Sequence, residues 1–254
     1  MRVTIVGCSG SFAGPASPAS CYLVRTEHEG RTWSIVLDLG SGALGTLQQH
    51  VDPRDLDAVF LSHLHPDHCI DLCGLYVVQR YHPDGASPRM PVYGPQGAGP
   101  RLREAYGSDD PAAMETEFVF HDHADAVAVT LGPFTVTPYA VNHPVPAFGL
   151  RVEADGTVLA YTGDTGECDA LTPLMAGADL VLADSAFVAG RDTLNGIHLN
   201  GAQCAQAATR AGGVKRLMLT HIPAWNDREV CRAQAAEHWA GDVELAEPGA
   251  TYAV

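Results

Sequence analysis

The chain has 254 residues, of which 46% are hydrophobic and 18% charged, values that fit a folded, enzyme-sized protein. Its formal net charge is −15, so it lacks the excess of Lys and Arg with which proteins bind nucleic acid backbones. No apolar run approaches the roughly 20 residues of a membrane-spanning helix, so no membrane partner is expected. Only six residues precede the first glycine loop, too few for a secretory signal, which predicts a cytoplasmic location.

Short β-rich runs dominate the first half of the chain, and Gly and Pro separate them. Strands are predicted over 2–6, 21–26, 33–39 and 57–62. Helices are predicted over 42–51 and 68–81, and a loop-rich connection over 81–100. The middle of the chain predicts further strands over 91–94, 117–121, 126–131, 134–141, 148–154 and 157–163.

The last third alternates between predicted strands and helices. Strands are expected over 179–185, 216–221 and 242–247, with helices over 201–212 and 227–239. Bursts of strands with helices between and after them favour two packed sheets covered by helices on the outside. No change of composition marks a linker, so a single domain over residues 1–254 is predicted.

A histidine-rich run follows the apolar strand 57–62. His63 and His65 are two residues apart, so in extended chain their imidazoles point the same way and can converge on one ion. Pro66 turns the chain, so Asp67 and His68 face another direction and can serve a second ion. Imidazole and carboxylate groups are suitable ligands for zinc, iron or manganese.

Four further candidates stand at strand ends or in a glycine-flanked loop. His143 follows the strand 134–141, Asp164 ends 157–163, His221 ends 216–221, and His198 precedes the helix 201–212. Sites are usually assembled where strand ends emerge at one edge of a sheet. Singly, His143 also fits a loop histidine and Asp164 a turn residue, but together with the histidine-rich run they predict a metal site.

This pattern, HxHxDH followed by distant H, D, H and H, resembles the metallo-β-lactamase superfamily, and the resemblance covers nearly the whole chain. It implies an α/β fold, a four-layer αββα sandwich of two mixed β-sheets. Asp164 and the separate His198 and His221 resemble the ribonuclease Z-like phosphodiesterase branch. The ligands implied for one metal are His63, His65 and His143, and those for the other are Asp67, His68 and His221, with Asp164 bridging both.

The same resemblance implies the chemistry. Two divalent metal ions, with zinc as the default and manganese or iron compatible, would share a hydroxide nucleophile. Asp67 would hold and orient the proton of that hydroxide, and His198 would act as general acid or transition-state stabiliser. Asp38 matches the aspartate of the family's first motif, which supports a ligand loop without binding metal. A plain turn residue remains the alternative for Asp38.

Two features favour a small phosphodiester over tRNA. Only 20 residues separate His143 from Asp164, where ribonuclease Z commonly carries its tRNA-binding arm, and the chain is acidic. The runs GCSGS, LSHLHPDHCIDLCGLYV and AYTGDTGECDAL are similar to actinobacterial cyclic-AMP phosphodiesterases of this fold. The predicted substrate is therefore a 3′,5′-cyclic nucleotide such as cAMP. The alternatives are a tRNA 3′-end endoribonuclease, a lactone or thioester hydrolase, and a non-catalytic sensor of metal or nucleotide. A homodimer is also implied.

Several other residues carry weaker expectations. The seven cysteines are expected to be reduced thiols, with Cys69 and Cys73 noted beside the histidines. The glycine loop 7–20 is either a plain turn or a lining for substrate through backbone N–H groups and the hydroxyls of Ser9 or Ser11. A solvated loop is expected for His121, Asp122, His123 and Asp125, and a surface position for His28, His50, His82 and His238. The aromatic residues that either stack on a purine or belong to the core are Tyr81, Phe148, Phe187 and Trp225.

Overall fold

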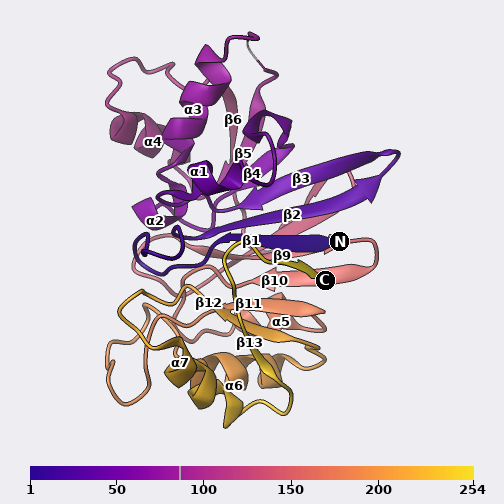
Figure 1. Ribbon diagram of the computed structural model, residues 1–254, viewed down its shortest axis with the longest axis vertical. Helices are drawn as coiled ribbons and strands as arrows, with labels where there is room; N and C mark the ends of the chain where they lie inside the picture. Colours follow the sequence, from indigo (N-terminus) through magenta and orange to yellow (C-terminus); the bar gives the residue numbers. More distant parts are fainter. Residues whose placement is uncertain (86) are drawn as a thin grey trace.

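The structure is a computed structural model that describes residues 1–85 and 87–254. Two seven-stranded sheets lie face to face, with helices on both outer faces (Figure 1). The first sheet has the spatial order β14 (Thr251–Ala253), β1 (Arg2–Gly7), β2 (Cys21–His28), β3 (Arg31–Leu37), β4 (Ala58–Phe60), β5 (Met90–Gly94) and β6 (Phe118–Asp122). The second has the order β13 (Val243–Leu245), β12 (Leu217–Thr220), β11 (Leu180–Asp184), β10 (Thr157–Tyr161), β9 (Phe148–Ala154), β8 (Phe134–Ala140) and β7 (Val129–Leu131).

Both sheets are mixed in the same way. Strands β14, β1, β2 and β3 pair antiparallel, and β3 to β6 pair parallel. In the second sheet β7 to β10 pair antiparallel, and β10 to β13 pair parallel. The parallel strands β4 and β11 are buried along their whole length, which explains their uninterrupted apolar runs. The predicted pair of mixed sheets is confirmed.

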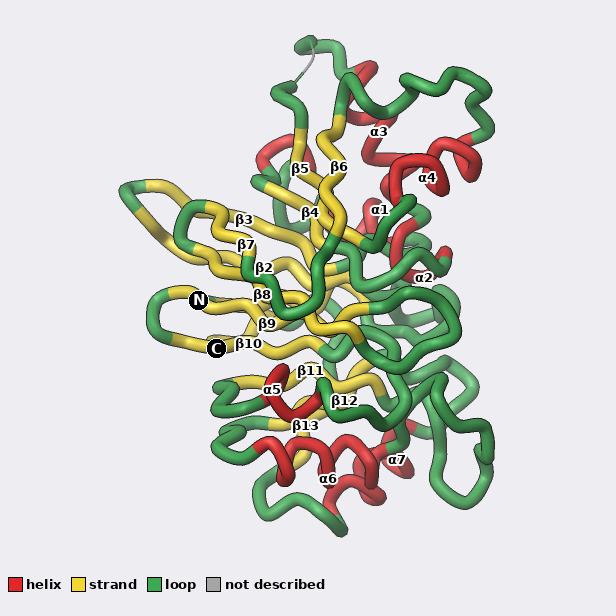
Figure 2. The backbone as a smooth tube through the Cα atoms, turned by 180° about the vertical axis from the view of Figure 1, so that it is seen from behind, coloured by secondary structure: helices red, strands yellow, loops and turns green. Residues whose placement is uncertain are grey.

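The helices form the outer layers. Figure 2 shows the same layers from behind. The helices are α1 (Ala43–Leu47), the 3-10 turn η1 (Pro53–Asp55), α2 (Pro66–Cys69), α3 (Leu72–Tyr81), α4 (Ala98–Tyr106), α5 (Leu171–Met175), α6 (Gly201–Ala211) and α7 (Arg228–Ala236). Helices α1 to α4 lie beside the first sheet, and α5 to α7 beside the second (Figure 1). None of these helices is long and apolar enough to cross a bilayer.

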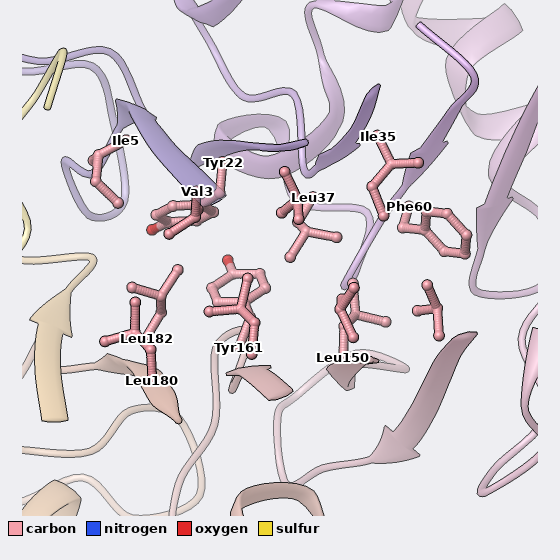
Figure 3. Packing of buried hydrophobic residues seen from close by; sticks show 14 of the residues in the cluster. Val3, Ile5, Tyr22, Ile35, Leu37, Phe60, Leu150, Tyr161, Leu180 and Leu182 are labelled. Carbon is pink, nitrogen blue, oxygen red and sulfur yellow. The ribbon is translucent and has the colours of Figure 1, made fainter. Parts of the chain in front are cut away.

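Three apolar clusters hold the four layers together. The central one joins the inner faces of the sheets, where Tyr22 and Phe60 of the first face Leu150, Tyr161 and Leu182 of the second (Figure 3). A second cluster lies between the first sheet and α1, α3 and α4, and a third between the second sheet and α5 to α7. Each sheet is therefore apolar on both faces, as a four-layer sandwich requires. The extent of the predicted single domain stays a prediction.

The prediction of one helix over 68–81 is wrong in one respect, because the helix is interrupted between α2 and α3. The Asp71 N–H donates to the Leu39 carbonyl, and the Asp71 carboxylate accepts from the Leu44 N–H, so Asp71 leaves the helical pattern. The loop after β3, which carries Gly40, can approach α2 because residue 40 has no side chain. A Cβ there would lie 1.9 Å from the Asp67 carbonyl oxygen. The break allows Asp67 and His68 to occupy a short, separately positioned turn.

Other boundaries also differ from the predictions. The helix predicted over 42–51 ends at Leu47 and continues as turns. The loop-rich connection over 81–100 contains β5 and the start of α4, and its residue 86 lies outside the described residues. The predictions missed α4, α5 and β14. Strand β8 ends at Ala140, so His143 lies three residues beyond the strand, in a loop that bridges to Gly166.

Candidate metal centre

The candidate residues gather at one edge of the sandwich, where strands of both sheets end. His63 follows β4, and the loop after β3 carries Asp38. From the second sheet, Asp164 follows β10 and His221 follows β12. Because β10, β11 and β12 are parallel, their carboxyl ends share one edge and direct these loops toward the same place.

Three histidines form a first cluster. The distance from His63 Nε2 to His65 Nδ1 is 2.9 Å, and that from His143 Nε2 to the same His65 atom is 3.2 Å. Asp164 Oδ2 lies 3.7 Å from His63 Nε2. Ligands bonded to a tetrahedral zinc ion at about 2.0–2.1 Å lie about 3.3 Å from one another, so these atoms have the spacing of one ligand set.

A second cluster lies beside the first and includes the same aspartate. His68 Nε2 is 3.3 Å from Asp67 Oδ2 and 3.2 Å from Asp164 Oδ1. His221 Nε2 is 3.2 Å from Asp164 Oδ2 and 3.8 Å from Asp67 Oδ2. Both clusters contain carboxylate and imidazole atoms within 4.8 Å of one another, and Asp164 belongs to both. The shared position fits a bridging carboxylate between two cations.

The polar atoms of these clusters also have the hydrogen bonding that a metal site requires. His68 Nδ1 donates to Asp38 and His143 Nδ1 to the Ile197 carbonyl, while His221 Nδ1 pairs with the Ser20 hydroxyl at 2.9 Å. Each of these rings thus has its outer nitrogen held from behind, while its inner nitrogen faces the clusters. Two buried inner atoms, His68 Nε2 and Asp164 Oδ1, lie 3.2 Å from each other and have no well-formed hydrogen bond to any described residue. Buried polar atoms of this kind fit a cation between them.

Asp38 is a fully buried hub between the sheets. Its Oδ1 accepts from the Ser62 backbone N–H at 2.6 Å. Its Oδ2 accepts from the Ser62 hydroxyl, from His68 Nδ1 and from the Tyr161 hydroxyl, each at 2.7 Å. Asp38 has a φ of 58°, a strained conformation that surrounding contacts must maintain. Asp38 is therefore a turn residue that also orients His68, while its contribution to catalysis stays a prediction.

The glycine loop between β1 and β2 packs against His221. His221 has a φ of 55°, and a Cβ on Gly10 would lie 2.2 Å from the His221 carbonyl oxygen. The Ser11 backbone N–H donates a hydrogen bond to His221 Nε2 at 3.3 Å. The loop thus reaches the metal centre through backbone, whereas the Ser9 hydroxyl is buried without a partner.

His198 lies beside both clusters and is held by a residue that the sequence did not indicate. Its Nδ1 is 2.9 Å from Asp184 Oδ2, and its ring lies 5.4 Å from the ring of His221. Burial opposes a positive charge on His198, but the Asp184 carboxylate overrides this and raises the pKa of His198 to about 9. Asp184 ends β11 at the same edge as Asp164, and that strand-end position was the signal available for finding it.

The three histidines of the first cluster have the protonation state of metal ligands. Burial lowers the pKa of His63, His65 and His143, so these rings are neutral at pH 7, as coordination requires. Burial opposes the charge on Asp164, but the neighbouring imidazoles, His221 first, lower the pKa of its carboxyl group. The first cluster therefore combines neutral nitrogen donors with the ionised carboxylate of Asp164.

The expectation of a solvated loop is wrong for His123. His121 and Asp122 end β6 and are exposed, as is Asp125, but His123 turns inward and its Nε2 donates to the Leu61 carbonyl at 3.0 Å. Burial lowers the pKa of His123 to about 4. His123 therefore belongs to the neutral interior below the metal centre.

Other residues divide between surface and interior. Of the expected surface histidines, His28 and His238 are exposed, whereas His50 and His82 are half-buried. All seven cysteines are free, and burial raises the pKa of Cys69 to about 12, so its thiol is unreactive. Among the aromatic candidates, Tyr81 and Trp225 are exposed, while Phe148 and Phe187 are partly buried.

Comparison with known proteins agrees with this fold and site. Residues 34–222 match the family model described as the beta-lactamase superfamily domain. The chain belongs to this superfamily. The chain is also 42% identical over 258 residues to the uncharacterized protein Rv1339 of Mycobacterium tuberculosis, covering 100% of this chain and 92% of that protein.

Two solved structures of beta-lactamase superfamily folds are also similar. The metallo-β-lactamase fold protein YhfI of Bacillus subtilis, named a probable metallo-hydrolase, superposes with a TM-score of 0.86 at 28% identity, covering 99% of both chains. The short form of human tRNase Z superposes with a TM-score of 0.78 at 21% identity, covering 100% of this chain and 99% of that one, which shows the fold alone. The chain is thus a metal-dependent hydrolase of the metallo-β-lactamase fold, and its place in the ribonuclease Z-like branch stays a prediction. The assignment of individual ligands stays a prediction.

Proposed function

We propose that this chain is a binuclear metal-dependent phosphodiesterase that hydrolyses a small phosphodiester, with a 3′,5′-cyclic nucleotide such as cAMP as its substrate. The observation that carries the proposal is the pair of adjacent clusters that share Asp164, with His198 beside them. A pair of cations suits a phosphodiester, because its two non-bridging oxygens share one negative charge. The acidic surface does not oppose this, since bound cations reverse the sign of the charge locally.

The residues proposed to hold the metals are those of the two clusters. The first ion would have His63, His65 and His143, and the second Asp67, His68 and His221, with Asp164 between them. Zinc suits these ligands, and manganese and iron are compatible with them. When bound, two such ions neutralise the charge of a phosphodiester and lower the pKa of a water molecule that they share.

The protein's own groups account for the proton transfers. Asp67, whose carboxylate lies beside His68 and His221, accepts and orients the proton of the attacking water. His198 donates its Nδ1–H to Asp184. Because the ring is protonated at pH 7, its Nε2 also carries a hydrogen, which can protonate the departing oxygen. The Ser11 N–H donates to His221 Nε2 in this structure, and it would be free to donate to a phosphate oxygen of the substrate when that nitrogen holds a metal.

Two observations favour a small substrate with a planar base. Residues 144–163 contain only β9, β10 and a short turn, so the described chain has no long arm there to bind tRNA. Two aromatic residues stand close in the chain to residues of the centre: Phe12 follows Ser11, and Trp225 lies four residues after His221. The ring centroids of Phe12 and Trp225 are 4.8 Å apart. Trp225 is 66% exposed, so its face is available for stacking on a nucleobase.

The test compares turnover of 3′,5′-cAMP, bis-p-nitrophenyl phosphate and a tRNA precursor by the metal-replete protein. We expect hydrolysis of both small diesters and little processing of the tRNA precursor. Efficient tRNA processing without cleavage of either diester would replace this proposal with an endoribonuclease. Cleavage of a lactone or thioester alone would also refute it.

The role of His198 is tested separately. His198→Ala should lower turnover of cAMP roughly 10²–10⁴-fold, because general acid catalysis contributes that much, and change hydrolysis of bis-p-nitrophenyl phosphate less, since its leaving group needs no proton. Metal content, measured by elemental analysis, should stay unchanged, with His238→Ala as the exposed control. Loss of a metal from His198→Ala would make His198 a ligand instead.

A further inference from the structure

A second cavity opens at the opposite edge of the first sheet. It has a volume of about 610 Å³, within the range of small-ligand sites. Its walls come from the starts of β1, β3 and β5, the middle of β2, η1 and α3. We call it the arginine cleft, because the residues that give it its charge are Arg2, Arg25, Arg31, Arg54 and Arg89.

The charge of the arginine cleft contrasts with that of the whole chain. Five of the 15 basic residues line it, against two aspartates, in a protein of net charge −15. Arg31 pairs with Asp57 at 2.8 Å, whereas Arg2 approaches Glu27, and Arg54 approaches Asp84, only to 3.8 Å. Among the described residues, no carboxylate forms an ion pair with Arg25 or Arg89. These two guanidinium groups donate instead to the backbone carbonyls of His50 and Phe118. The cleft therefore carries positive charge that the protein does not neutralise.

Buried polar groups at the cleft also lack partners. Gln79 of α3 is only 3% exposed, yet neither Oε1 nor Nε2 of its amide has a hydrogen-bond partner. Arg25 Nε is buried without one as well. Burial, together with the charge of Arg2, lowers the pKa of Arg25 more than the charge of Glu27 raises it. Such groups are rare in folded proteins unless water or a ligand satisfies them.

The arginine cleft is separate from the metal centre. Strand β3 runs from Arg31, at the cleft, to Leu37, next to Asp38. At about 3.3 Å per residue, seven residues of strand put the two sites roughly 20 Å apart. A ligand in the cleft therefore cannot touch the metal ligands.

We propose that the arginine cleft binds a small anion that carries a phosphate group. Guanidinium groups match phosphate oxygens with paired hydrogen bonds, and the unpartnered Gln79 amide offers one donor and one acceptor to the rest of the ligand. The ligand is small, because the surface of the chain as a whole is acidic and repels extended polyanions. This site is independent of the proposed phosphodiesterase activity.

The test is calorimetric titration of the metal-replete full chain with inorganic phosphate, AMP and adenosine. We expect phosphate and AMP to bind in the cleft, and adenosine, which has no phosphate, not to bind there. The double variant R25Q/R89A should bind phosphate and AMP in the cleft at least about tenfold more weakly, because it removes two charged donors. Its hydrolysis of bis-p-nitrophenyl phosphate should be unchanged. Asp164→Ala, which alters the metal centre, should keep the cleft event.

Two further variants keep the test decisive. R210A/R232A removes the same charge from exposed positions on α6 and α7 and should bind phosphate like the wild type. Gln79→Glu keeps the size of the side chain and adds a negative charge in the cleft, so it should also abolish binding while leaving the protein folded. Wild-type phosphate binding by R25Q/R89A and Gln79→Glu would overturn the proposal. An equal loss of phosphate binding in R210A/R232A would also overturn the proposal. Adenosine binding as tightly as AMP would do so as well.

Discussion

The two edges of the first sheet carry opposite chemistry. Strands β3, β4 and β5 begin at the arginine cleft, and β3 and β4 lead to the loops of the metal centre. At the centre the functional groups are buried imidazoles and carboxylates, joined across the sheets by the Tyr161–Asp38 hydrogen bond. In the cleft they are guanidinium groups, of which Arg2 and Arg31 are half exposed to solvent.

This difference shows two ways in which an acidic protein can bind an anion. The metal centre has negative ligands of its own and needs bound cations before it attracts a phosphodiester. The arginine cleft has permanent charge and needs no cofactor. Metal removal should therefore abolish anion binding at the metal centre but not in the arginine cleft. Substitutions at either site should leave anion binding at the other unchanged.

The largest expected effect is that of Asp164→Ala, because Asp164 belongs to both clusters. Turnover of any diester should fall roughly 10³-fold or more, since the two-cation site is lost, and bound metal per chain should fall by at least half. Elemental analysis and steady-state rates measure both. Asp169→Ala, an exposed aspartate on the same loop, is the control. A fully metallated and active Asp164→Ala protein would contradict the bridging assignment.

The second prediction concerns the pH dependence of stability between pH 4 and 7, to which His123 beside the metal centre should contribute. His123 has its pKa lowered to about 4 by burial, against about 6.5 when unfolded. The unfolded chain thus binds a proton that the folded chain refuses, so stability is complete above pH 6.5 and is lost as the pH falls toward 4. The shift corresponds to up to about 3 kcal/mol of unfolding free energy.

Denaturant unfolding at pH 7 and pH 5 measures this contribution. His123→Gln keeps a donor for the Leu61 carbonyl and does not titrate, so its free energy of unfolding should fall less between the two pH values. Acid release of metals affects both proteins alike, so their difference isolates His123. An equal fall in the free energy of unfolding from pH 7 to pH 5 in the two proteins would show that His123 is charged in the folded state.

The third prediction concerns Asp38→Asn, which keeps the shape of the side chain but places an amide among four donors. Because Asp38 orients His68, we expect a loss of roughly 10–100-fold in metal affinity or turnover. Tyr161→Phe removes one donor from the same hub and should cost less. Metal titration of the three proteins measures this order. A smaller loss in Asp38→Asn than in Tyr161→Phe would show that the hub serves folding alone.

Sequence reasoning predicted the fold and the residues that gather at the metal centre because their signals are local. An apolar strand followed by HLHPDH, or strand ends such as Asp164 and His221, can be recognised without knowing which strands pair. Asp184, Ser20 and Tyr161 were missed because their roles depend on contacts between distant elements. The arginine cleft was missed for the same reason, since its residues are scattered from Arg2 to Arg89.

The smallest expected effect tests whether the metal-centre edge also recognises a base. Trp225→Ala should raise the KM for cAMP about tenfold, because base stacking on an aromatic ring contributes about 1–3 kcal/mol. The KM for glycerol 1,2-cyclic phosphate, which has no base, should stay constant, as should phosphate binding in the arginine cleft. Tyr81→Ala is the control, because Tyr81 is 62% exposed and lies on α3.

Steady-state kinetics with the two cyclic diesters decide the matter, and quenching of tryptophan fluorescence by AMP provides a readout without turnover. The quenching should be reduced in Trp225→Ala and unchanged in Tyr81→Ala. An equal rise in KM for both diesters would mean that Trp225 supports the loop rather than the base. In that case the base would make its contacts elsewhere, and recognition at this edge would rest on the phosphodiester alone.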